Sequence, residues 1–193
     1  MNEKTKRTDT KTLVLAALLT AMVVILQFVG ASIRFGMFSI SLVLIPIVVG
    51  GALCGVSVAS WLGFVFGLVV LLSGDAAAFL AFSIPGTVIT VILKGVACGY
   101  AAALTYKFVY SLTKRLYVAV IAAAIVCPVV NTAVFLLGCL VFFFNDIMPK
   151  DAGAWEVIKY MVFVLVGGNF LFELATNIIL GPVVVRLINI RNK

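Results

Sequence analysis

The sequence predicts an all-α integral membrane protein with six transmembrane helices and both termini in the cytoplasm. Of its 193 residues, 64% are hydrophobic and 11% are charged, whereas a soluble domain has about 45–50% apolar and about 25% charged residues. The apolar residues form six runs separated by short polar or glycine-containing breaks. A spanning helix needs about 20 apolar residues, so this length has room for roughly six spans and for no soluble catalytic domain.

The first apolar run follows a polar tail, residues 1–11, that contains four basic residues. The run is too long for the apolar part of a signal peptide and no A-x-A-like cleavage site closes it, so we expect a retained helix over about 12–30. The second run, about 38–49, is short for a span and contains Pro46. We therefore expect a helix there that is kinked or extended by part of the preceding loop.

Glycines at 50, 51 and 55 indicate a turn before a third helix, which we expect over about 53–72. The loop that follows contains the apolar residues 76–82, so we expect it to fold back onto the protein. The last three helices are expected over about 86–108, 116–143 and 155–187. One transmembrane domain, residues 12–188, then lies between the cytoplasmic tails 1–11 and 189–193.

The basic residues give the predicted orientation. With both termini inside, the N-terminal tail, the connection between helices four and five and the C-terminal end contain ten of the fourteen Lys and Arg residues. The outer loops and their flanks contain three, namely Arg34, Lys150 and Lys159. This asymmetry follows the positive-inside rule. The net charge of +7 therefore indicates membrane orientation rather than nucleic-acid binding.

The residue types in the sequence argue against several kinds of catalytic and cofactor chemistry. The sequence has no histidine, and its four cysteines lie singly in apolar runs. We therefore expect no zinc site, no histidine-ligated haem and no catalytic triad, and we interpret the cysteines as small buried hydrophobes. No GxxxxGK[ST] sequence is present, so this chain cannot use ATP alone. We expect neither a metal nor a cofactor.

Polar residues inside the spans are the candidate functional residues. Lys94 lies midway along the fourth helix and Glu173 midway along the sixth, although a charge at the bilayer centre costs at least ~2.5–3.5 kcal/mol. Asn169, Glu173 and Asn177 are spaced four apart and so share one helix face. With Asn131 of the fifth helix, they predict a pocket in the outer half of the bundle. We expect Lys94, Asn131 and Asn169 to line it, with Glu173 at its floor.

Structural roles are alternatives for these residues. Lys94 and Glu173 could pair with each other, and the asparagines could join helices by hydrogen bonds, which suits the deeper Asn177 best. Arg34 and Asp75 lie in outer loops that could cover a pocket. Both are therefore candidate substrate-binding residues, although a solvated loop charge needs no such explanation.

Small residues four positions apart allow helices to approach closely. Three such pairs are present, namely Ala17 and Ala21, Gly63 and Gly67, and Gly95 and Gly99. We expect the two glycine pairs to make packing contacts inside the bundle.

Several segments, taken in order, resemble the S components of energy-coupling factor (ECF) vitamin transporters. The resemblance covers about residues 10–188 and includes the basic N-terminus, the alanine spacing of the first helix and the long apolar loop after the third. Its most characteristic segments are 35–47, 62–68, 85–87, 93–95 and 127–132.

The resemblance implies high-affinity binding of one micronutrient in a pocket near the outer face. Helices four to six would line that pocket, and the loops after helices one, three and five would cover it. It also implies assembly, in the plasma membrane of a prokaryote, with a transmembrane T component and two ATPase subunits that use the ATP. Ala17 and Ala21 match the face that meets the T component, although Met22 and Ile25 stand where a further alanine would continue the spacing.

The candidate residues favour pantothenate as the vitamin. A lysine, a carboxylate and several amides suit a small ligand with a carboxylate, hydroxyls and an amide, with Lys94 or Arg34 on the carboxylate. A flavin site is expected to stack rings on Trp or Tyr, but Phe can also stack, so riboflavin is the alternative. A stand-alone ion-coupled carrier is a second alternative. A membrane enzyme with Glu173 and Lys94 as an acid–base pair is a third.

Overall fold

The computed structural model describes residues 10–32, 34–35, 38–39, 42–143, 159 and 167–191. In this part of the chain, six helices of eleven or more residues form one bundle. A one-turn helix, α4 (Ala77–Leu80), and an antiparallel pair of two-residue strands, β1 (Arg34–Phe35) and β2 (Phe38–Ser39), complete it. The six are α1 (Thr10–Ser32), α2 (Leu44–Cys54), α3 (Val56–Leu72), α5 (Ile84–Thr113), α6 (Leu116–Phe142) and α9 (Gly167–Arg191).

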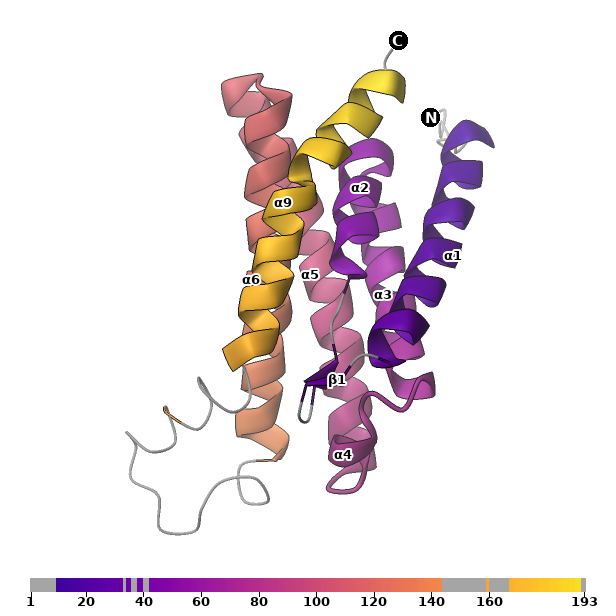
Figure 1. Ribbon diagram of the computed structural model, residues 1–193, viewed down its shortest axis with the longest axis vertical. Coiled ribbons are helices and arrows are strands. Elements are labelled where there is room, and N and C mark those ends of the chain that lie inside the picture. The colour runs from indigo at the N-terminus through magenta and orange to yellow at the C-terminus, as the bar shows by residue number, and fades with distance from the viewer. Residues whose placement is uncertain are drawn as a thin grey trace, which may run out of the picture.

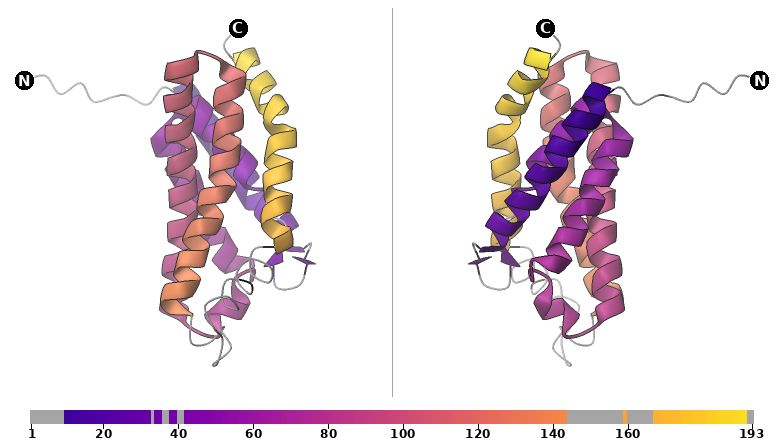
Figure 2. Two further views of the ribbon diagram at one scale, coloured as in Figure 1. Left: turned by 90° about the vertical axis from the view of Figure 1, so that its left-hand side faces the viewer. Right: turned by 90° about the vertical axis from the view of Figure 1, so that its right-hand side faces the viewer.

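The six helices alternate in direction, and α5 lies at the centre of their packing (Figure 1). It packs on α3 and α6, while α9 packs on α6 and α1 packs on α2 and α3. Figure 2 shows α1 crossing obliquely on the face away from α6. The start of α1 and the end of α9 lie at one end of the bundle, which we call the terminal end. The strands and α4 lie at the other, which we call the ribbon end.

The predicted class, a helical membrane protein, is confirmed apart from the short strand pair. Three helices, α1, α5 and α6, are long and apolar enough to cross a membrane, and α2 and α3 are shorter apolar helices. Six spans and cytoplasmic termini stay predictions. The described part of the last helix begins at Gly167, so the expected start near 155 lies outside the described residues. So does the loop after the fifth predicted helix.

The second predicted helix was misplaced. We expected it over 38–49, but residues 34–39 contain the strand pair and α2 begins only at Leu44. Pro46 therefore lies in the first turn of α2, where a missing backbone N–H is tolerated, and neither a kink nor an extension into the loop is needed. The helix also runs through Gly50 and Gly51. The turn falls at Gly55, whose φ of 89° favours glycine.

The contact between α3 and α5 is made by glycines. A Cβ atom added to Gly63 would collide with the carbonyl oxygen of Gly95, and one added to Gly95 would collide with that of Gly63. Gly99 meets the carbonyl oxygen of Ala59 in the same way. Because backbone lies on backbone here, neither helix can make room for a side chain. The predicted internal packing of these glycines is confirmed.

The segment between α3 and α5 folds back onto the bundle, as predicted. Ala76 and Phe79 are buried, whereas Phe82 is exposed. α5 then starts at Ile84 because the Ser83 hydroxyl accepts a hydrogen bond from the backbone N–H of Gly86 at 3.3 Å, which is an N-cap.

Candidate substrate-binding site

Two of the predicted site residues meet where α6 packs on α9. Asn131 Nδ2 donates a hydrogen bond to Glu173 Oε2 at 3.5 Å. The two side chains are only 5% and 2% exposed, respectively. A carboxylate buried this deeply has to be stabilised by neighbouring polar groups, because an isolated charge in an apolar interior is very costly.

Asn177, one turn after Glu173, has a local bond instead. Its Nδ2 donates to the backbone carbonyl of Glu173 at 2.8 Å, within α9. This amide is therefore satisfied by its own helix. Asn169 lies one turn before Glu173 in α9, and its side chain lies outside the described residues.

Lys94 lies roughly 15 Å from the start of α5, since it follows Ile84 by ten residues at about 1.5 Å per residue. Its ammonium lies 5.5 Å from the centre of the Phe66 ring of α3 and 5.3 Å from that of the Phe135 ring of α6. Both rings can stabilise the cation through their π faces. Phe135 lies one turn from Asn131, so the ammonium is held close to the Asn131–Glu173 pair along α6.

The aromatic residues around Lys94 form a packed group. Phe79 of α4 meets Phe135 edge-on at 5.3 Å between ring centres and meets Phe143 in a similar way at 5.5 Å. The folded-back segment is thereby joined to the ring that lies under the Lys94 ammonium.

Three buried polar atoms in the described part of the chain have no hydrogen-bond partner. They are Gln27 Oε1, Thr90 Oγ1 and Asn131 Oδ1. Leaving a buried polar atom unpaired costs about 1–3 kcal/mol, so each such atom calls for a reason. Two of them are near the Lys94–Asn131–Glu173 group: Asn131 belongs to it, and Thr90 lies one turn before Lys94 on the same face of α5.

Thr90 is a candidate that the sequence reasoning missed. Its side chain is buried against Gly138 of α6 and occupies the space that a Cβ atom on Gly138 would need. The available signal was its position four residues before Lys94, which places both side chains on one face.

The two outer-loop candidates lie elsewhere in the fold. Asp75 Oδ2 accepts a hydrogen bond from Gln27 Nε2 of α1 at 3.2 Å. Arg34 is in β1, paired in register with Ser39 of β2 at the ribbon end, and its side chain lies outside the described residues.

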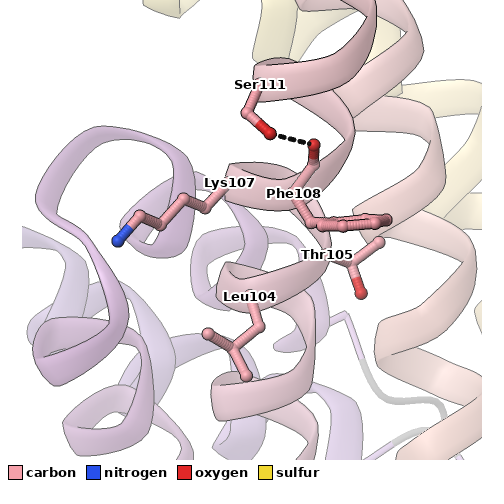
Figure 3. Close-up of a pocket in the computed structure, with 5 residues that line it drawn as sticks. All are labelled: Leu104, Thr105, Lys107, Phe108 and Ser111. Carbon is pink, nitrogen blue, oxygen red and sulfur yellow. Dashed lines mark hydrogen bonds between the residues drawn. The ribbon is translucent and has the colours of Figure 1, made fainter.

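A separate hollow of about 610 Å³ lies on the surface of α5 toward the terminal end (Figure 3). The Ser111 hydroxyl there donates to the carbonyl of Phe108 at 2.7 Å, and the Lys107 side chain is exposed. The hollow therefore offers an open surface rather than a buried polar site. Its lining residues are Leu104, Thr105, Lys107, Phe108 and Ser111.

The cysteines behave largely as predicted. Cys98, Cys127 and Cys139 are free and buried, while Cys54, at the end of α2, is partly exposed. The expected absence of metal and cofactor stays a prediction.

A bundle of apolar helices, three of them long enough to cross a membrane, defines the class of the protein, which is a helical membrane protein. The comparison with known families makes this specific. A family model described as the ECF transporter, substrate-specific component, matches residues 11–188. The match covers most of the chain, so the protein belongs to this family. Searches of curated proteins and of solved structures gave no match.

Membership sets the general role of the chain. It is a multi-pass membrane protein and the substrate-specific subunit of an ECF importer. Such a subunit takes a small-molecule substrate and works with T and ATPase components, so the chain is a transporter subunit rather than an enzyme.

Proposed function

We propose that this chain is the high-affinity binding subunit for pantothenate and that the vitamin binds among Lys94, Asn131, Asn169 and Glu173. The observation that carries the proposal is the Lys94 ammonium, which lies over two phenylalanine rings. Thr90, one turn before Lys94, and Asn131, one turn before Phe135, each have a buried polar atom that lacks a hydrogen-bond partner. ATP is used by the partner ATPases, and this chain needs no cofactor. The complex works in the plasma membrane of a prokaryote.

The cation supports an acidic substrate. An ammonium in apolar surroundings attracts a carboxylate strongly, because charge-assisted hydrogen bonds are about twice as strong as neutral ones. Lys94 is half-buried, and its ammonium has three N–H donors. The contacts with the two rings are not conventional hydrogen bonds, so these donors can still bond to a substrate. A substrate carboxylate would complete this site.

The neighbouring groups support a substrate that also has hydroxyls and an amide. Asn131 Oδ1 and the Glu173 carboxylate accept hydrogen bonds, and the Thr90 hydroxyl can accept or donate one. Pantothenate combines a carboxylate with two hydroxyls and an amide. Its donors match these acceptors, and its carboxylate matches Lys94.

The aromatic packing favours pantothenate over riboflavin. A flat ring system needs an open slot between aromatic faces, whereas Phe79, Phe135 and Phe143 pack edge to face on one another. Trp61, the tryptophan in the described part of the chain, is 52% exposed. Riboflavin thus has less support among the described residues.

The partner surface is proposed on α1. Ala17 and Ala21 lie on its exposed side, next to the exposed apolar residues Leu18 and Met22. Small residues flanked by apolar ones let another helix approach closely in a membrane. We propose that the T component packs there.

Native mass spectrometry of the purified chain tests the proposal directly, because it weighs whatever the chain retains. We expect protein with one bound pantothenate after purification from a pantothenate-containing medium. Retained riboflavin would mean that the substrate is riboflavin, while the role as a binding subunit would stand. In a separate transport assay, uptake by the chain without T or ATPase subunits would favour the stand-alone carrier instead.

A further inference from the structure

One part-buried hydrogen bond outside the Lys94–Asn131–Glu173 group joins α1 to the segment between α3 and α5. Gln27 Nε2 donates to Asp75 Oδ2 at 3.2 Å, and the Gln27 side chain is only 1% exposed. The two residues are 48 positions apart, so the bond forms only when the fold brings α1 to this segment. An amide that donates to a carboxylate makes a stronger bond than two neutral groups do.

The segment that Asp75 begins leads to the site. We call residues 75–82 the cap segment. Phe79, in its middle, is 6% exposed and packs on the Phe135 ring. The Lys94 ammonium lies over that same ring. The cap segment therefore has a polar anchor at its start and an aromatic anchor one ring away from Lys94.

The cap segment cannot hold this position by itself. Its helix, α4, has four residues, and so short a helix is not stable alone in water. Its local backbone bonds, such as Phe79 N–H to the Ala76 carbonyl at 3.0 Å, fix the turn but not its place on the bundle. That place depends on contacts with other elements.

We propose that Gln27 and Asp75 are positioning residues that hold the cap segment, and with it Phe79, against the binding site. Without the Gln27 bond, Phe79 loses its fixed place on Phe135, and the ring under Lys94 loses its support. The role at the site rests on the proposed function, whereas the anchoring of the segment does not.

Hydrogen–deuterium exchange on the full chain in detergent micelles, without vitamin, tests the anchor. Gln27→Leu and Asp75→Ala should each speed exchange of the backbone amides of 76–82 by about tenfold, the scale of one hydrogen bond to a charged group. Ser32→Ala is the matched control. It removes a hydroxyl from the same helix that bonds only to the Phe28 carbonyl, so exchange in the cap segment should not change.

An exchange of donor and acceptor separates the bond from a general loss of stability. Gln27→Glu combined with Asp75→Asn places a carboxylate on α1 and an amide on the cap segment, with the same side-chain lengths. We expect this double variant to restore slow exchange. Exchange as fast as in Gln27→Leu, or unchanged exchange in both single variants, would overturn the anchor.

The dissociation rate of pantothenate tests the role at the site. We expect release from Gln27→Leu to be about tenfold faster than from the wild type, with the donor–acceptor exchange variant near wild type. Unchanged release from a protein whose cap segment exchanges faster would overturn the positioning role. A wild type that binds no pantothenate would refute the proposed vitamin, while the exchange result would still decide whether Gln27 anchors the segment.

Discussion

Helix α5 makes two contacts of opposite character. Toward α3 it offers glycines, and the two backbones touch at Gly63 and Gly95. Toward α6 it offers Thr90 and Lys94, near the Asn131–Glu173 pair, and the Lys94 ammonium also lies over the Phe66 ring of α3. The glycine contact brings backbone against backbone and leaves no room for a side chain. The second contact contains charges, an amide and atoms without partners.

The difference reflects how helices associate in lipid. Lipid tails are as apolar as leucine, so helices gain little from hiding apolar side chains and more from close contact through small residues. The α3–α5 contact uses this fully and is suited to be a rigid scaffold. The contact that contains Thr90, Lys94 and Asn131 is less stable, because its unpaired polar atoms are costly until a ligand supplies hydrogen-bond partners. We infer that one side of α5 holds the fold and the other holds the substrate.

The largest expected effect is on the scaffold side. Gly95→Ala normally gains about 1 kcal/mol in a helix, but here the added Cβ meets the Gly63 carbonyl oxygen, which cannot move aside. We expect a net loss of about 1–3 kcal/mol in the free energy of unfolding, as for overpacked cores. Thermal unfolding in micelles measures it.

Gly181→Ala is the matched control. Its added Cβ would meet the end of the flexible Ile121 side chain, which can rotate away. We expect stability equal to or slightly above wild type. A Gly95→Ala protein as stable as Gly181→Ala would mean that the α3–α5 contact is not tight.

The next effect is on the polar side. Asn131→Ala and Asn169→Ala should each weaken vitamin binding by about 1–3 kcal/mol while the protein still folds, because buried groups of site and ligand lose partners. Isothermal titration measures it. Asn177→Ala is the control, since that amide bonds to its own helix and should leave affinity unchanged. Equal losses in all three variants would assign the asparagines to helix packing.

No effect on binding is expected from a substitution at the outer surface of α1, although transport should be lost. Ala21→Trp should block transport by the assembled complex but leave binding to the isolated chain intact, since bulk there prevents close approach of the T component. Leu137→Trp, on the exposed face of α6, should change neither. Loss of both functions in Ala21→Trp would place Ala21 inside the bundle.

The sequence predicted the long helices well, and its errors have a physical cause. The expected ranges 86–108 and 116–143 fall close to α5 and α6, since long apolar runs without alternatives form helices in a membrane. The strand pair was missed because four strand residues leave no periodic pattern. The start of α2 was therefore placed too early.

The candidate site was predicted through the cost of burying polar groups. That argument identified Lys94, Asn131 and Glu173, and the structure brings Asn131 to Glu173. Thr90 was missed because a hydroxyl is cheap to place in a span. The bond from Gln27 to Asp75 could not be predicted, because it depends on how α1 crosses the bundle.

The central claim is that Lys94 binds a substrate carboxylate, and affinity measured for two ligands tests it most directly. Pantothenate and its alcohol analogue are titrated against wild type and Lys94→Met. We predict a loss of about tenfold to a hundredfold for the acid and a much smaller loss for the alcohol, since only the acid has a charge for the ammonium.

The double variant Lys94→Met with Glu173→Gln is measured beside it. If Lys94 and Glu173 only form a structural pair, the double change should restore the stability lost in either single change and should barely alter affinity. Under our account, the double variant still discriminates against the acid. Equal losses for acid and alcohol in Lys94→Met would contradict the carboxylate role, and with it the preference for pantothenate.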